Sequence, residues 1–205
     1  MIKTVIFDLG GVLIPFDPSR SFVAMEPYCD HSAKQIPEIL RQTDLVRRFE
    51  TGRIGSQEFV AELSNLLGLR VSYQEFCDLW SKPFLLQALV PPEMLERLHR
   101  KYRLIALSNT NPIHFDAVQR IYPFLAYFDD FVLSYQVGHL KPAALIYEEA
   151  VRRAGCLPCE CLYIDDAEPY VAAAAALGIN AAQFRDYAGL AAILAHHGVA
   201  TSDIA

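Results

Sequence analysis

The chain has 205 residues, of which 53% are hydrophobic and 20% charged; this is enough apolar material for a sizeable core and excludes wholesale disorder. A net charge of −6 argues against non-specific binding to nucleic acid or to anionic lipid. We expect no signal peptide and no membrane span, because the N-terminal MIKTVIF is short and no uncharged apolar run approaches ~20 residues. The odd number of five cysteines favours reduced thiols and a cytoplasmic protein.

The first predicted strand covers residues 5–7 and ends at Asp8, within the sequence VIFDLGGVL. A buried carboxylate is unfavourable unless it pairs, binds a metal or becomes neutral, so a lone acid here indicates a functional site. Gly10 follows two residues later, at the position where a second acid would have made a pair with Asp8.

Residues 17–90 look helical throughout and contain no convincing strand. Ser56 can cap a helix with one apolar stripe, and Ser72 opens the capping-box sequence SYQE of another helix. We therefore predict that residues 17–90 form a small inserted α-helical cap, and that residues 1–16 and 91–205 together form the core.

After residue 90, short apolar runs alternate with helical patterns. The predicted strands are residues 103–107, 131–134, 161–164 and 179–184, and the predicted helices are residues 92–100, 142–154 and 169–177. Strands that are apolar throughout and are separated by helices indicate a parallel sheet covered on both faces. The predicted fold is therefore α/β, a doubly wound, Rossmann-like parallel sheet with the helical cap inserted after its first strand.

Polar residues stand at the predicted strand ends and before one helix, at the edge of the sheet where ligands bind in such folds. They are Asp8, Ser108, Asn109, Lys141, Asp165 and Asp166. Carboxylate oxygens are ligands for Mg²⁺, and an aspartate can attack phosphorus. A hydroxyl and an ammonium can bind phosphoryl oxygens. The set therefore indicates chemistry on a phosphate with a hard cation.

The ordered motifs DLGGV, LSNT, LKP and YIDD resemble those of the haloacid dehalogenase-like hydrolase superfamily, and the resemblance covers nearly the whole chain. The segments FDLGGVL, FDPSR, FETGRIGSQEF, LSNTN and KPAALIYEEA look like its α-D-glucose-1-phosphate phosphatase-like branch. The resemblance implies a Mg²⁺-dependent hydrolase of phosphoric monoesters, with a cap that closes over a small phosphorylated metabolite.

The resemblance also implies a role for each matching residue. Asp8 would be the nucleophile and a magnesium ligand. The other implied metal groups are the main-chain carbonyl of Gly10, the carboxylate of Asp166 and, in support of it, Asp165. The residues implied to bind the transferring phosphoryl group are Ser108 and Lys141, with Asn109 lining the site.

Two positions depart from the family pattern. Many phosphatases of this superfamily carry a second aspartate where this chain has Gly10; it protonates the leaving oxygen and then activates water, and such general acid–base catalysis is worth ~10²- to 10⁴-fold. Glycine can do neither, and Asp17 is a candidate substitute base, although Asp-Pro more often makes a turn. Tyr170 stands where relatives often place Asn or Asp in support of the metal.

Other clusters have structural explanations that compete with functional ones. The CxxCxC sequence of Cys156, Cys159 and Cys161 has no second ligand pair for a metal, and His196–His197 is interpreted as a solvated helix end. Trp80, Phe84 and Tyr73 could wall a substrate pocket or form the core of the cap. Arg47, Arg48 and Arg53 could reach a second anionic group or lie on a solvated helix face.

The lead hypothesis is a cytoplasmic phosphatase that uses Mg²⁺ and an aspartyl-phosphate on Asp8 to hydrolyse a small phosphoester, such as a hexose 1-phosphate. A 2-haloacid dehalogenase-type hydrolase, which attacks carbon and needs no metal, is disfavoured because Asp165 and Asp166 would repel a carboxylate substrate. A third alternative is a low-activity scaffold that binds a phosphometabolite or a partner, because Gly10 lacks the acid. The substrate, the choice between Mg²⁺ and Mn²⁺ and the oligomeric state stay open.

Overall fold

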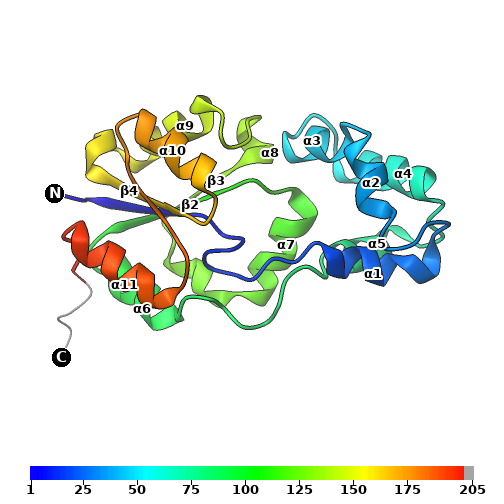
Figure 1. The fold of residues 1–205 in the computed structure, drawn as a ribbon, viewed down its shortest axis with the longest axis horizontal. Coiled ribbons are helices and arrows are strands. Elements are labelled where there is room, and N and C mark those ends of the chain that lie inside the picture. The colour runs from blue at the N-terminus through cyan, green and yellow to red at the C-terminus, as the bar shows by residue number, and fades with distance from the viewer. Residues whose placement is uncertain (201–205) are drawn as a thin grey trace.

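A computed structural model of the chain describes residues 1–200 and contains one five-stranded parallel sheet (Figure 1). Its strands are β1 (Thr4–Phe7), β2 (Arg103–Ser108), β3 (Asp130–Leu133), β4 (Cys161–Asp165) and β5 (Asn180–Gln183). They lie in the order β3-β2-β1-β4-β5, and every neighbouring pair is parallel. The prediction of a doubly wound, Rossmann-like α/β sheet is therefore confirmed.

Helices cover both faces of the sheet. Successive side chains of a strand point to opposite faces, so both faces carry apolar residues that the helices bury in two hydrophobic clusters. Val5 and Phe7 of β1 point into the cluster shared with α6 (Pro92–His99), α7 (Pro112–Ile121) and α11 (Tyr187–His196). Ile6 points to the other face, where α9 (Ala144–Ala154) and α10 (Glu168–Ala176) pack. All four residues of β1 are buried, as expected of a central strand.

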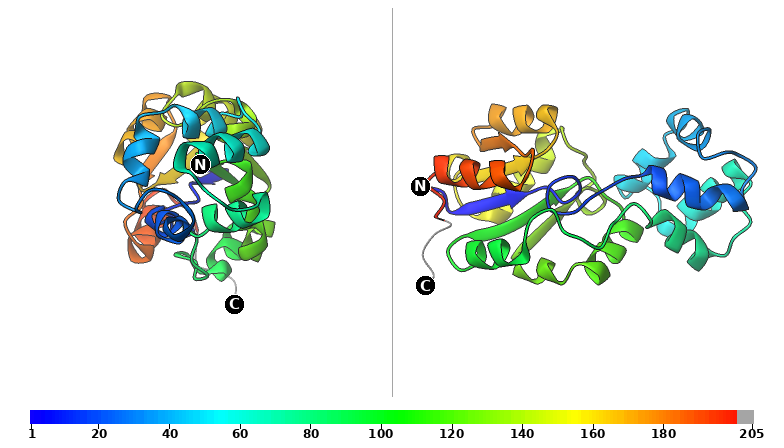
Figure 2. Two further views of the ribbon diagram at one scale, coloured as in Figure 1. Left: turned by 90° about the vertical axis from the view of Figure 1, so that its right-hand side faces the viewer. Right: turned by 60° about the horizontal axis from the view of Figure 1, so that its bottom comes forward.

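Five further helices come between β1 and α6 in the chain. In space they lie beyond the carboxyl ends of the strands and away from the chain termini (Figures 1 and 2). They are α1 (Ser19–Met25), α2 (Ile36–Arg41), α3 (Leu45–Glu50), α4 (Ser56–Leu67) and α5 (Tyr73–Trp80). These helices surround a hydrophobic cluster of their own, in which the rings of Phe49 and Phe59 stack with centroids 4.1 Å apart. Phe16 and Phe84, on the two segments that connect this group to the sheet, pair in an isolated antiparallel bridge.

The helix ends follow the sequence signals with small differences. The capping box of Ser72 is present, but Ser56 is the first residue of α4 and Gly55 is its N-cap. Helix α9 begins at Ala144 rather than at Pro142, because Ala143 still has the extended conformation of an N-cap. Among residues 1–200, no helix combines the length and the apolar character that crossing a membrane would require.

The strand order places the site of chemistry at one edge of the sheet. The chain runs outward from β1 to β2 and β3, and then crosses back to β4 on the other side of β1. A crevice opens where the direction of winding changes, so the carboxyl ends of β1 and β4 are the expected place for a ligand. Asp8 follows β1, and Asp165 and Asp166 stand at the end of β4.

Candidate active site

Asp8 is held at the end of β1 by its own backbone. Its N–H donates to the carbonyl of Ile164 on β4 over 2.9 Å, and its Oδ1 accepts a hydrogen bond of 2.7 Å from the N–H of Leu9. The residue is buried, and this burial raises the pKa of Asp8 to about 6 in spite of the attraction of a nearby lysine.

That lysine is Lys141, whose ammonium lies between two acids. Its Nζ is 2.9 Å from Oδ1 of Asp8 and 2.6 Å from Oδ2 of Asp165, and it also donates to the carbonyl of Leu107 over 3.3 Å. Burial by itself would lower the pKa of Lys141, but the two carboxylates outweigh it and raise the pKa. The ammonium is therefore charged and fixed beside Asp8.

Asn109 acts on the main chain of Lys141. Its Nδ2 donates to the Lys141 carbonyl over 3.1 Å, and the Lys141 N–H donates to its Oδ1 over 2.8 Å. This reciprocal pair ties the end of β2 to the loop before α9 and sets where the lysine side chain starts. Ser108, one residue earlier, is buried and lines the same cavity as Asp8.

Asp165 is fully occupied by other protein groups. Its Oδ2 binds Lys141 and accepts a hydrogen bond from the Tyr163 hydroxyl, and its Oδ1 accepts one of 2.8 Å from the N–H of Ala167. The side chain is completely buried. Asp165 therefore positions Lys141, and it is poorly placed to be a direct ligand of a metal as well.

The acidic residues form a group that fits a hard cation. Asp8, Asp165 and Asp166 each offer a carboxylate oxygen, and these oxygens lie within 4.8 Å of one another. Three carboxylates face one ammonium, so the group carries an excess of negative charge. Burial and the neighbouring Asp165 raise the pKa of Asp166, as expected for crowded acids. Among the described residues, the Gly10 carbonyl accepts no backbone hydrogen bond and is free to be a further oxygen ligand.

Gly11 makes room for Asp166. Its φ is +84°, a region that favours glycine, and a β-carbon there would lie only 2.6 Å from Oδ2 of Asp166. The second glycine of DLGGV is thus required both by backbone conformation and by the close approach of an acid from β4.

A cavity of about 310 Å³ brings most of the predicted site residues together. Those that line it are Asp8, Gly10, Ser108, Asn109, Lys141 and Asp166; Phe84 and Tyr170 also face it. Lys141 is the only lysine or arginine in its wall, and the lysine Nζ lies 5.0 Å from the centre of the Tyr170 ring. Tyr170 therefore contacts the site through its aromatic face.

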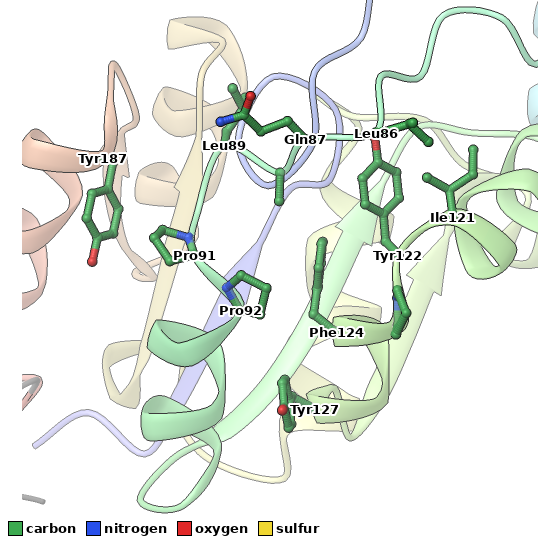
Figure 3. Close-up of a pocket in the computed structure, with 12 residues that line it drawn as sticks. Leu86, Gln87, Leu89, Pro91, Pro92, Ile121, Tyr122, Phe124, Tyr127 and Tyr187 are labelled. Atoms are coloured by element: carbon green, nitrogen blue, oxygen red, sulfur yellow. The ribbon is translucent and has the colours of Figure 1, made fainter.

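A larger cavity of about 620 Å³ lies elsewhere, between the segment of residues 86–92 and the end of α7 (Figure 3). Leucine, proline and aromatic side chains dominate its wall, which includes no acid, lysine, arginine or histidine. The smaller cavity, and not this one, holds the groups that can perform chemistry.

Sequence reasoning missed two residues in the wall of the smaller cavity, Glu50 at the end of α3 and His114 on α7. His114 Nε2 donates to the Trp80 carbonyl over 2.9 Å, and its Nδ1 accepts from the Asn111 amide over 3.1 Å. With both nitrogens engaged, the ring is neutral. Burial lowers the pKa of His114 to about 4. The histidine therefore fastens α5 to α7 and has no free nitrogen for catalysis.

This neutral histidine predicts a loss of stability in acid. Because the pKa is about 4 in the folded protein and about 6.5 when unfolded, the unfolded state binds more protons between these values. At pH 5 this should lower the free energy of unfolding by ~2 kcal/mol relative to pH 8. Urea unfolding of the wild type and of His114→Gln at both pH values measures this effect. The difference in unfolding free energy between the two proteins isolates the histidine from other titrating groups. If this difference were the same at pH 5 and pH 8, the neutral state of His114 would be contradicted.

The comparisons with known proteins agree with this geometry. A sequence profile of the haloacid dehalogenase-like hydrolases matches residues 2–178. The chain belongs to this family. The hydrolase is also 28% identical over 191 residues to a D-ribitol-5-phosphate phosphatase of Bacteroides thetaiotaomicron, a match that spans 89% of this chain and 92% of the relative.

Two solved structures resemble this haloacid dehalogenase-like hydrolase over nearly its full length. One is a family member from Bacteroides thetaiotaomicron in complex with magnesium and inorganic phosphate, with a TM-score of 0.80 and 28% identity, covering 93% of this chain and 99% of that one. The other is a predicted family hydrolase from Porphyromonas gingivalis, with a TM-score of 0.80 and 31% identity, covering 95% and 98%.

Several candidate residues of this hydrolase lie outside the cavity wall. Asp17 is exposed and accepts hydrogen bonds from the N–H and hydroxyl of Ser19, which is the turn that Asp-Pro predicts. Tyr73 is exposed, Trp80 is buried in the helical cluster, and Arg48 pairs with Glu62. Arg47 and Arg53 are exposed. The three cysteines of CxxCxC are free thiols and, within residues 1–200, belong to no group of candidate metal ligands.

Proposed function

We propose that this hydrolase is a Mg²⁺-dependent phosphatase that removes phosphate from a small phosphorylated metabolite through an aspartyl-phosphate on Asp8. The observation that carries the proposal is the arrangement around Lys141, whose ammonium is fixed 2.9 Å from Asp8 while Ser108 and Asp166 face the same cavity. A nucleophile, a cation and a hydroxyl directed at one small space suit a phosphoryl group.

The residues of the site divide the work of phosphoryl transfer. Asp8 attacks phosphorus through a carboxylate oxygen, and water later releases phosphate from it. Lys141 neutralises charge on the phosphoryl oxygens, and Ser108 donates a hydrogen bond to them. Asn109 and Asp165 hold Lys141 in place through its main chain and its ammonium.

The metal groups of this proposal are the carboxylates of Asp8 and Asp166 and the carbonyl of Gly10. When bound there, Mg²⁺ would neutralise the negative charge that three carboxylates and a phosphate bring together. We place Asp165 behind this set, because its oxygens already bind Lys141, Tyr163 and Ala167.

The close approach of Gly11 to Asp166 makes the metal site sensitive to one added carbon. Gly11→Ala should displace Asp166 and weaken Mg²⁺ binding by ~10- to 100-fold, as changes next to metal ligands typically do. Isothermal titration with Mg²⁺ measures the effect. Gly155→Ala is the matched control, since Gly155 also has a positive φ but open space around it; equal Mg²⁺ affinities in the two variants would contradict the prediction.

We further propose that residues 17–90 act as a cap over a core formed by residues 1–16 and 91–205. The helices of this segment have their own apolar cluster, and Glu50 and Phe84 contribute to the wall of the cavity from that side. The cavity volume of about 310 Å³ suits a small polyol or sugar phosphate and is too small for a folded protein. The D-ribitol-5-phosphate phosphatase relative supports such a substrate class. Five free cysteines suit a cytoplasmic location.

Two other functions have weaker support. A dehalogenase would have to bind a negatively charged carboxylate substrate next to three carboxylates that are balanced by only one ammonium, and these would repel it. The missing acid at Gly10 suggests a scaffold that binds a ligand without turnover. Such a scaffold does not explain why Asp8, Ser108, Lys141 and Asp166 all face one cavity.

The experiment is phosphate release from a panel of pentitol, pentose and hexose phosphates and from 4-nitrophenyl phosphate, with Mg²⁺ and with EDTA. We expect release that requires Mg²⁺ and favours a subset of the panel. Release that persists in EDTA would contradict the metal assignment. No release from any ester would contradict the phosphatase and favour the scaffold, and chloride release from 2-chloropropionate would favour the dehalogenase.

A further inference from the structure

The cavity contains an acid that the mechanism above does not use. Three acidic side chains line it, Asp8, Asp166 and Glu50. The first is the proposed nucleophile and the second a proposed metal ligand, whereas Gly10 leaves the leaving oxygen without a proton donor. We propose that Glu50 is this donor, and that it replaces, from the end of α3, the aspartate missing at Gly10.

The backbone around Glu50 places it at the junction between the helical segment and the sheet. Glu50 is the last residue of α3, and Gly52, two residues later, has a φ of +67°. A β-carbon at Gly52 would collide with the carbonyl oxygen of Tyr135 in α8 (Ser134–Val137), so the two backbones are in direct contact. Helices α3 and α8 lie side by side in Figure 1. This contact seats the end of α3 on the rim of the site.

The surroundings of Glu50 favour the protonated form of its carboxyl. On its other side lies an apolar cavity whose wall includes Phe22, Leu40 and Trp80. Among the described residues, no side chain hydrogen-bonds to the carboxyl or pairs with it, and partial burial raises the pKa of Glu50 to about 7. A carboxylic acid of this kind can give up a proton near neutral pH and take it back.

The other titratable groups near the cavity are less suitable. Both nitrogens of His114 are engaged by Trp80 and Asn111, and Asp17 is exposed and bound to Ser19. Lys141 is held between two carboxylates and stays charged. Glu50 is the one acid in the cavity wall that has neither a partner nor another assigned role.

The two half-reactions then balance, given the phosphatase activity on which this inference rests. As an oxygen of Asp8 bonds to phosphorus, the bond from phosphorus to the ester oxygen breaks, and the Glu50 proton passes to that oxygen to release an alcohol. The Glu50 carboxylate next accepts a proton from the water that attacks phosphorus. The bond between phosphorus and Asp8 breaks, which yields inorganic phosphate and restores both acids.

The test is the dependence of the Glu50→Gln defect on the leaving group, measured with Mg²⁺ on an alkyl phosphate, phenyl phosphate and 2,4-dinitrophenyl phosphate. We expect kcat/KM for the alkyl ester to fall ~10²- to 10⁴-fold and for the dinitrophenyl ester to change little, because dinitrophenolate needs no proton. The second half-reaction should also slow, so the dinitrophenyl ester should give a burst of one phenolate per site. Glu26→Gln, an exposed acid of the same helical segment, is the control.

The other outcomes distinguish a failure of the Glu50 proposal from a failure of the proposed phosphatase function. An equal fall in kcat/KM for all esters, or a higher KM at unchanged kcat, would make Glu50 a positioning or binding residue and overturn the proposal. Unchanged kinetics would also overturn it and leave the phosphatase intact. If the wild type itself hydrolyses no ester, the proposed function fails and the role of Glu50 falls with it.

Discussion

Asp8→Asn should abolish phosphate release, lowering kcat by at least about 10⁴-fold, because an amide oxygen cannot take the place of the attacking carboxylate. The fold should survive this change. Burial raises the pKa of Asp8 above its usual range, so the ionised side chain opposes folding at neutral pH in the protein without metal. Lys141 also keeps its second partner, Asp165.

The measurement is single-turnover and steady-state phosphate release by the wild type and by Asp8→Asn, together with urea unfolding of both without Mg²⁺. Asp129→Asn, at an acid outside the cavity wall, is a suitable control for the assay. Residual activity above about one part in a hundred, after correction for deamidation, would show that Asp8 is not the nucleophile.

Lys141→Met should be the most destabilising single change at the site. The variant leaves Asp8 and Asp165 buried and facing each other without the ammonium that now lies within 3 Å of both. Breaking a buried ion pair by removing one partner typically lowers the free energy of unfolding by about 3–5 kcal/mol. The loss should be larger at pH 8 than at pH 5, because burial raises the pKa of Asp8 and, without the ammonium, this carboxyl favours folding only while it is protonated.

Urea unfolding without Mg²⁺ at the two pH values measures this effect, and the exposed Lys101→Met is the matched control. A loss below about 1 kcal/mol at pH 8 would mean that Lys141 is not needed to offset the buried acids. A loss independent of pH would point to packing and not to charge.

The fold could be predicted because its strands carry a local signal. VIF and CLYI are apolar throughout, which only a strand with both faces covered can satisfy, and the helices between the strands show their own periodicity. The cavity residues at the strand ends also came from the sequence, since parallel strands bring their carboxyl ends to one edge, whereas Glu50 and His114 did not. The boundaries of the proposed cap at residues 17 and 90 stay a prediction.

The partners within the site could not be predicted in the same way. Asp165 is next to Asp166 in the sequence, yet one is buried against Lys141 and Tyr163 while the other faces the cavity. The amide of Asn109 could equally have faced a ligand, but it binds the main chain of Lys141, 32 residues later. Neighbouring polar residues look alike in a sequence, and a small rotation of the chain decides which of them meets a buried cation.

The sequence by itself determined the succession of the five strands along the chain, three of the helices that cover the sheet, the family motifs and the absence of an acid at Gly10, because these depend on residue type and local periodicity. The helices α7 and α11 were not predicted. Only the tertiary structure decided that His114 is engaged on both nitrogens and that Glu50 reaches the cavity from α3. Both follow from the way the helical segment packs on the end of the sheet. That packing joins residues far apart in the chain, through contacts that no local pattern encodes.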